Sequence, residues 1–161
     1  MKRLAILLSV ACAALVTVVA LVTTSGAQQP GPPTRTLDLV TRQRESTFKF
    51  VDNPPLHKES AGDMAIITGR LRARDGSPQG RLQAYFVATK SGNFERAFRG
   101  QVSGTFMLRG GDIVIAGVTD DKRAHDRLPI VGGTGSYAGA RGVLVVTDTR
   151  TRTRFHLAFL P

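Results

Sequence analysis

The stretch LPIVGGTGSYAGARG, residues 128–142, decides how this chain folds. Its Gly133-x-Gly135-x-x-Ala138 core matches the dinucleotide-binding fingerprint, which needs a strand before the glycines and a helix after them. The following residues, RGVLVVTDT at 141–149, are rich in β-branched side chains that disfavour a helix, and too few residues remain for a βαβ unit. Because glycine permits positive φ and close backbone approach, the stretch instead predicts a tight, bulged corner between two strands. The glycines that build this corner are Gly132, Gly133, Gly135, Gly139 and Gly142.

The pattern outside this corner is typical of antiparallel β structure. Short runs of β-branched and aromatic residues alternate with polar turns, and no convincing amphipathic helix interrupts them. The predicted strands are residues 36–40 resuming at 47–51, 63–73, 80–90, 99–108, 113–119, 143–149 and 155–160. Seven or eight short strands predict a sandwich or a closed barrel. The runs at 113–118 and 143–146 are apolar on both faces, which favours a barrel with a filled lumen and an outer surface packed on other subunits.

The N-terminus has the three parts of an export signal. Lys2 and Arg3 precede an uncharged apolar run, Leu4–Val22, and the small residues Ser25-Gly26-Ala27 follow it. This order predicts a signal peptide over residues 1–27 and a secreted, extracellular or cell-envelope-associated protein. About 20 apolar residues can also span a bilayer, so an uncleaved anchor is the alternative, and membrane contact is expected only through this segment.

A Pro/Gly-rich linker at residues 28–35 leads into a single domain at 36–161. The one cysteine, Cys12, lies in the predicted signal peptide, so the domain has no disulfide and no thiol chemistry. The formal net charge of the chain is +10. A basic exported protein suits polyanionic surroundings such as cell-wall polymers or membrane headgroups, and we expect no nucleic-acid partner.

The glycine stretch resembles the signature of plant dirigent proteins and of the related allene oxide cyclase barrels. GRLQAYFVATKSG at 80–92 is similar to the dirigent segment ahead of the mid-barrel hairpin, and VDNPPL at 51–56 to the acidic Asp-Pro-Leu loop. AGDMAIITGRL at 61–71 is similar to the Gly-Asp segment that opens the cyclases' second strand. The resemblance covers most of residues 36–161. It implies an eight-stranded antiparallel β-barrel of the calycin type, a homo-oligomer (trimer or dimer), and no metal or organic cofactor.

The resemblance also implies a chemistry. Dirigent proteins steer the stereoselective coupling of phenoxy radicals or the cyclisation of quinone methides, and allene oxide cyclases fold a fatty-acid epoxide into a cyclopentenone. Both hold a reactive chain in one conformer in a dry cavity. The expected ligand is therefore a small hydrophobic or phenolic compound, and any activity a cofactor-independent cyclisation or isomerisation. Gly69 replaces the cyclases' ligand-polarising Asn, and only Asp52 could stand for their catalytic Glu, which argues against allene oxide cyclase activity itself.

Three residues are candidates for catalysis. Asp52 aligns with an acidic residue that dirigent proteins place at the barrel mouth for proton transfer; the alternative is a loop charge in an Asx turn. Arg141 aligns with the arginine of the dirigent ARG motif, which faces the lumen and stabilises developing negative charge; the alternative is an exposed cation at a strand start or an ion-pair partner. Asp126 is a second candidate for proton transfer, or a solvated loop acid.

Three aromatic residues are candidates for ligand binding. Tyr85 lies beside the position of a lumen tyrosine in dirigent proteins, and Phe86 is the strict match. Because adjacent strand residues face opposite sides, one of the two points inward. Phe86 shares its face with Leu82 and Ala84, which favours a packed core residue. Tyr137 is expected to pack over the glycine corner.

The remaining polar residues suggest less specific chemistry. His57, His125 and His156 are too scattered to predict a metal site. TDTRTRTRF at 147–155 places three arginines on one side of an extended segment, either as a solvated strand face or as a groove for a polyanion. Two other functions stay open beside a dirigent-like catalyst: a non-catalytic, lipocalin-like carrier, and a basic structural protein of the cell envelope.

Overall fold

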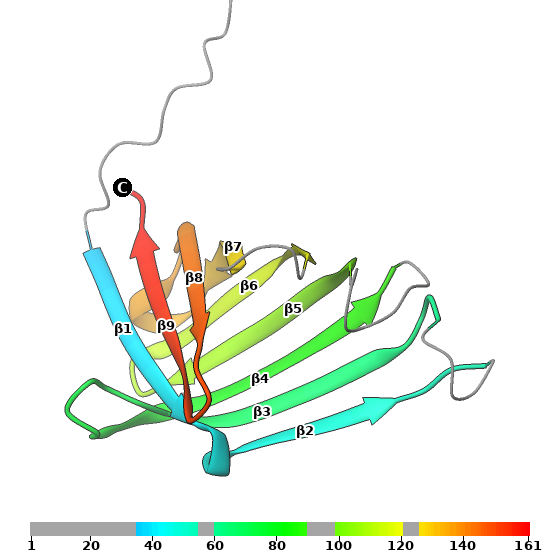
Figure 1. Cartoon of the computed structure of the whole chain (residues 1–161). Helices are drawn as coiled ribbons and strands as arrows, with labels where there is room; N and C mark the ends of the chain where they lie inside the picture. Colours follow the sequence, from blue (N-terminus) through cyan, green and yellow to red (C-terminus); the bar gives the residue numbers. More distant parts are fainter. Residues whose placement is uncertain (1–34, 55–59, 90–98, 121–125) are drawn as a thin grey trace, which may run out of the picture. The chain divides into compact units, whose positions relative to one another are not determined.

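The computed structural model describes residues 35–54, 60–89, 99–120 and 126–161 (Figure 1). The predicted signal peptide and nearly all of the predicted linker lie outside these ranges. None of the helices within them has the length and apolar character that a membrane crossing requires.

The described residues form an antiparallel β-barrel. The strands are β1 (Arg35–Arg42), β2 (Ser46–Val51), β3 (Met64–Arg72), β4 (Pro78–Ala88), β5 (Arg99–Leu108), β6 (Gly111–Asp120), β7 (Asp126–Gly133), β8 (Gly142–Asp148) and β9 (Arg152–Phe159). Two 3₁₀ turns, η2 (Gln43–Glu45) and η3 (Gly135–Tyr137), join them. The order is β1-β9-β8-β7-β6-β5-β4-β3-β2, and β1 also pairs with β3 (Figure 1). Since β1 and β2 are two halves of one bent strand, this closed sheet is the predicted eight-stranded barrel.

The barrel closes where β1 bends into β2 at η2. Before the bend β1 pairs along its whole length with β9, and after it β2 pairs with β3. Val40 lies opposite Arg72 of β3, and the Thr41 hydroxyl donates a 2.8 Å hydrogen bond to the Arg70 carbonyl. Glu45 of η2 accepts two hydrogen bonds from Arg72, at 2.7 and 2.9 Å. One bent segment thus joins both edges of the sheet.

The interior of the barrel follows the period-2 alternation of its strands. On β4 the residues Leu82, Ala84, Phe86 and Ala88 are buried and the residues between them are more exposed, as the sequence predicts. Among the described residues, the fully buried apolar side chains come from six strands of the barrel: Leu39, Leu71, Phe106, Ile113, Leu144 and Leu157. The core therefore lies inside the barrel.

Strand β7 is missing from the predicted set, because the sequence indicates a charged loop at 120–127 and then only the short apolar run around Pro129. Pro129 has no amide hydrogen to give to a ladder. The register between β6 and β7 shifts between Val114 and Ile115, so the proline lies beside a bulge. On the other side Pro129 is paired with Val143 of β8, and its neighbours Leu128 and Ile130 are buried. Long-range pairing and burial thus override the local signal.

The glycine stretch forms the bulged corner that the sequence predicts. Its backbone is bound to the β5–β6 turn: the Thr134 amide donates to the Asp112 carbonyl at 2.8 Å, and the Ser136 amide to the Gly110 carbonyl at 2.7 Å. Gly135 has a φ of +57°, in the left-handed region. A Cβ on Gly133 would overlap the Tyr137 carbonyl and lie 2.6 Å from the Asp112 carbonyl oxygen.

The corner does not exclude side chains at every glycine. A Cβ on Gly132 would meet no atom within 4 Å, in contrast to Gly133 beside it. At Gly132 the corner therefore admits a side chain, because a Cβ there would point toward open space.

A buried carboxylate joins Asn53, just after β2, to Ser60, just before β3. Asp63 is 1% exposed and accepts hydrogen bonds from the Ser60 amide at 2.8 Å, the Asn53 amide at 2.9 Å and the Ser60 hydroxyl at 3.0 Å. The Ser60 amide, and after it the Asn53 amide, hold the pKa of Asp63 below its usual range. The ionised carboxylate is thus the form that these hydrogen bonds from Ser60 and Asn53 stabilise.

The two adjacent glycines offer a matched test of the corner. Gly133→Ala should lower the free energy of unfolding by about 1–3 kcal/mol, because the methyl group forces two carbonyls apart. Gly132→Ala should change it by less than about 0.5 kcal/mol. Urea denaturation of both variants measures the difference; equal midpoints would contradict this account of the corner.

Asp63 should contribute to the pH dependence of stability. Its folded-state pKa is lowered, so its contribution is present above the unfolded-state pKa of about 3.9 and is lost as the pH falls through the folded value. Asp63→Asn should therefore destabilise the protein at pH 7 and reduce the loss of stability between pH 5 and 3. Asp112→Asn, at a half-buried carboxylate that accepts no hydrogen bond from another described residue, is the control. Unfolding curves of Asp63→Asn that parallel those of the parent over this pH range would contradict the role.

Candidate functional site

The barrel contains a cavity of about 530 Å³. All nine described strands contribute to its wall. The inner part is apolar, with Phe106, Ile115, Leu128, Leu144 and Phe155 among its residues. Phe106 and Phe155 meet edge to face, with ring centroids 5.3 Å apart. Such a wall favours an apolar or aromatic ligand, which it removes from water.

One end of the cavity has a polar rim. It is formed where the η2 bend lies near the β8–β9 hairpin, and its residues are Thr41, Gln43, Ser46, Asp148 and Arg152. Asp148 accepts a 2.7 Å hydrogen bond from the Thr153 hydroxyl and one of 3.1 Å from the Thr149 amide. These groups can hydrogen-bond a hydroxyl, carbonyl or acidic group on a ligand whose apolar part lies deeper.

An aromatic side chain of β2 faces this cavity and remains exposed. Phe48 lies opposite Ile67 in the β2–β3 ladder, and Ile67 lies opposite Ala84, so Phe48 is on the interior side of the sheet. Its side chain lines the cavity, yet 63% of it is exposed. An apolar ligand that covered this ring would gain contact area without displacing any part of the packed core.

The structure does not bring the predicted catalytic residues together. Asp52 follows β2 and is half-buried, whereas Arg141 is exposed and directly precedes β8. Strand β2 ends beside the start of β3, and β8 starts beside the end of β9. Because β3 and β9 run in the same direction, these are opposite ends of the barrel. Neither side chain is part of the described cavity wall. Asp126 begins β7, and its side chain lies outside the described residues.

The predicted aromatic residues take different positions. Phe86 is buried in the cavity wall, and Tyr85, 48% exposed on the other face of β4, also contributes to that wall. Tyr137 lies at the glycine corner and stacks on Phe159, with ring centroids 6.1 Å apart. The guanidinium of Arg35 lies 5.0 Å from the Tyr137 ring centre. Tyr137 therefore packs at the end of the barrel opposite the polar rim.

Sequence reasoning missed the polar rim. Thr41, Asp148 and Thr153 occupy interior register positions, with Thr41 opposite Thr153 and Asp148 opposite Thr153. The sequence does contain a signal for Thr41. Leu37 and Leu39 point into the barrel, and Thr41 is the next residue in this alternation. The polar character of Thr41 and Asp148 predicts outward-facing side chains, but the alternation of β1 and β8 places both on the interior side.

Of the three histidines considered for a metal site, only His156 lies in the described ranges. It is on the outer face of β9, and its Nδ1 is 2.8 Å from Asp38 Oδ1. This hydrogen bond is the main cause that lowers the pKa of Asp38. In the parts of the chain that the structure describes, no three His, Cys, Asp or Glu side chains are grouped to hold a metal.

Several solved structures have the same fold. The chain is similar to a pyocyanin demethylase (TM-score 0.65, 24% identity, covering 78% of this chain and 99% of that one). It is also similar to a nonspecific heme-binding cyclase that catalyses a 4 + 2 cycloaddition in neoabyssomicin biosynthesis (TM-score 0.61, 21% identity, 79% and 67%). A third is a pterocarpan synthase dirigent protein (TM-score 0.60, 14% identity, 83% and 88%). At these identities the likeness shows the fold alone.

No curated protein matches the sequence. The family model described as Dirigent-like protein, however, matches residues 35–158, which hold the whole barrel except its last strand residue. The glycine corner, the closed sheet and the apolar interior all lie within the matched region. The chain belongs to the dirigent-like protein family.

Proposed function

We propose that the barrel binds a small apolar or aromatic compound in its lumen and guides the cyclisation or coupling of that compound. The observation that carries this proposal is the cavity of about 530 Å³, apolar inside and polar at its rim. Its volume lies in the range of about 300–1,000 Å³ that is usual for small-molecule sites. The exposed Phe48 ring in its wall supplies further surface that a ligand would cover.

Such a site would act by orienting its substrate. A cavity that admits one conformer of a flexible or radical substrate places the reacting atoms close together and excludes water, which favours one product. The cyclase and the pterocarpan synthase among the similar structures support this reaction class. We propose the same class for this barrel, acting after export and as a homo-oligomer.

Proton transfer would assist a phenolic or enolic substrate. We propose Asp52 as the acid–base group and Arg141, always protonated, as a stabiliser of developing oxyanion charge. Asp148 is a further candidate, since it lines the rim directly.

A carrier function is the second candidate, and one observation favours it. Asp52 and Arg141 lie at opposite ends of the barrel and outside the described cavity wall. A lipocalin-like carrier needs only the apolar lumen, whereas a catalyst needs at least one polar group at the reacting atoms.

Ligand binding can be tested with N-phenyl-1-naphthylamine, a neutral apolar fluorophore. Phe48→Ala should weaken its binding about three- to ten-fold, because the ligand loses an aromatic contact. The thermal midpoint should hardly change, since the ring is exposed. Val118→Ala is the matched control, as Val118 is 61% exposed and is not part of the described cavity wall. Fluorescence titration that finds equal affinities in Phe48→Ala and the parent would contradict the site.

Catalyst and carrier differ in what the charged residues do. With a phenol under an external one-electron oxidant, Asp52→Asn and Arg141→Leu should reduce the handedness of the coupled product but leave fluorophore affinity within a few-fold. Asp148→Asn tests the rim in the same assay. Chiral chromatography of the products gives the answer. If all three variants keep the handedness of the parent, or if the parent imposes none, the carrier function is favoured.

A further inference from the structure

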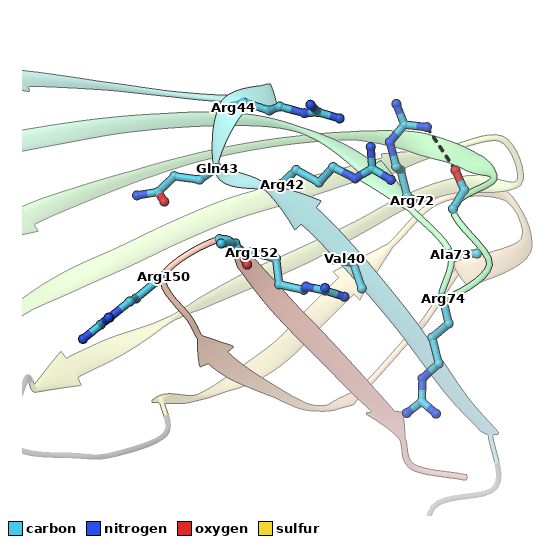
Figure 2. Close-up of a pocket in the computed structure, with 11 residues that line it drawn as sticks. Val40, Arg42, Gln43, Arg44, Arg72, Ala73, Arg74, Arg150 and Arg152 are labelled. Atoms are coloured by element: carbon cyan, nitrogen blue, oxygen red, sulfur yellow. Dashed lines mark hydrogen bonds between the residues drawn. The ribbon is translucent and has the colours of Figure 1, made fainter.

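A second cavity, of about 630 Å³, lies at the corner where the barrel closes. The end of β1, the η2 turn, the β3–β4 turn and the β8–β9 hairpin form its wall. We call it the arginine pocket, because its wall contains Arg42, Arg44, Arg72, Arg74, Arg150 and Arg152 (Figure 2). In Figure 2 the side chains of Arg42, Arg44 and Arg152 extend toward the β3–β4 turn, whereas Arg150 points away from it.

Two of these arginines have acidic partners. Arg72 donates through Nε and Nη2 to the Glu45 carboxylate and through Nη1 to the Gly76 carbonyl at 3.0 Å. The Arg72 guanidinium is the main cause that lowers the pKa of Glu45. Arg74 lies 3.2 Å from Asp38. Glu45 and Asp38 are therefore already engaged by arginines of the pocket wall.

Of the other four arginines, Arg42 and Arg44 interact with Glu45 only at longer range. Within the described ranges, no ion pair joins an acid to Arg42, Arg44, Arg150 or Arg152. Three of them, all but Arg150, point the same way in the pocket (Figure 2). This leaves an excess of positive charge in a concave site.

The β1–β9 register places two of these positive charges directly beside each other, which destabilises the sheet. Arg42 and Arg152 are direct partners in the β1–β9 ladder, so they leave the sheet on the same face. Like charges directly opposite each other on neighbouring strands destabilise a sheet. An anion between them would turn this repulsion into two favourable contacts.

A solvated basic face is the simpler explanation, but two features favour a site. The arginines surround a hollow whose wall also contains Val40 and Ala73, so they do not stand on a flat surface. Arg42 and Arg44, from the β1–η2 segment, and Arg152, from the β8–β9 hairpin, extend into it in the same direction (Figure 2). Planar guanidinium groups bind phosphate oxygens in pairs, which suits a compact anion of high charge.

We propose that the arginine pocket binds a phosphate-type oxyanion with at least two negative charges, such as a diphosphate group. Two sources supply this chemistry. One is a free anion. The other is the charged end of an amphipathic compound whose apolar part lies in the lumen, since Gln43 and Arg152 line both cavities. This second source rests on the proposed function; the anion site does not.

Calorimetric titration of the full chain with inorganic pyrophosphate tests the site. The parent should bind it, and the double variant Arg42→Gln/Arg152→Gln should bind at least about ten-fold more weakly. Arg127→Gln, at an exposed arginine of β7 outside the described pockets, should stay within about two-fold of the parent. Equal affinities in the double variant and the parent, or no binding by the parent, would overturn the proposal.

Thermal unfolding supplies a second readout that separates binding from folding. Without pyrophosphate the double variant should melt at or above the midpoint of the parent, because the repulsion between the two strands is removed. Saturating pyrophosphate should raise the midpoint of the parent and leave that of the double variant unchanged. A rise of the same size in both proteins would overturn the site.

Alkyl phosphates distinguish the two sources. Dodecyl phosphate that binds much more tightly than methyl phosphate, with the gain reduced by Phe48→Ala, would assign the anion to a ligand that also occupies the lumen. Equal affinities would assign it to a free anion. If pyrophosphate binds the arginine pocket while N-phenyl-1-naphthylamine does not bind the barrel, the proposed lumen function fails and the anion site stands.

Discussion

The change of partner at the η2 bend holds this barrel closed. Strand β1 is paired with β9, and three residues later the chain re-enters the sheet as β2, paired with β3. The hydrogen bond from the Thr41 hydroxyl to the Arg70 carbonyl and the Glu45–Arg72 ion pair fix the bend. Without this bend the sheet would present two open edges with unpaired backbone groups. The closed interior, and with it the cavity, depends on this corner.

The two ends of the barrel differ in how tightly their side chains are packed. At one end the glycine corner binds the β5–β6 turn through backbone hydrogen bonds, and Tyr137 stacks on Phe159. At the other end Phe48 of β2 stays exposed in the cavity wall, and polar groups line the rim. The first end is therefore tightly packed, whereas the second end exposes side chains that a ligand would cover.

The corner that closes the barrel also concentrates its positive charge. Arg72 stabilises the bend through Glu45, while Arg42 and Arg152 face each other across the strands that the bend joins. Natural proteins tend to place an unfavourable strand pair, such as two like charges, at a functional site. The same geometry therefore links the stability of the closure to the proposed binding of an anion beside the lumen.

Sequence alone was sufficient for the β class, for the inward face of β4 and for the bulged glycine corner. These features depend on alternation and on turn chemistry, which act between near neighbours. The sequence does not predict β7, because Pro129 locally disfavours a strand. Burial of its neighbours and pairing with β8 form the strand nevertheless. Nor does the sequence predict the separation of Asp52 from Arg141, the polar rim at Asp148, or the meeting of Arg42 with Arg152. Those positions follow from the register and closure of the sheet, which pair residues from opposite ends of the chain, and no local pattern records which residues will become partners.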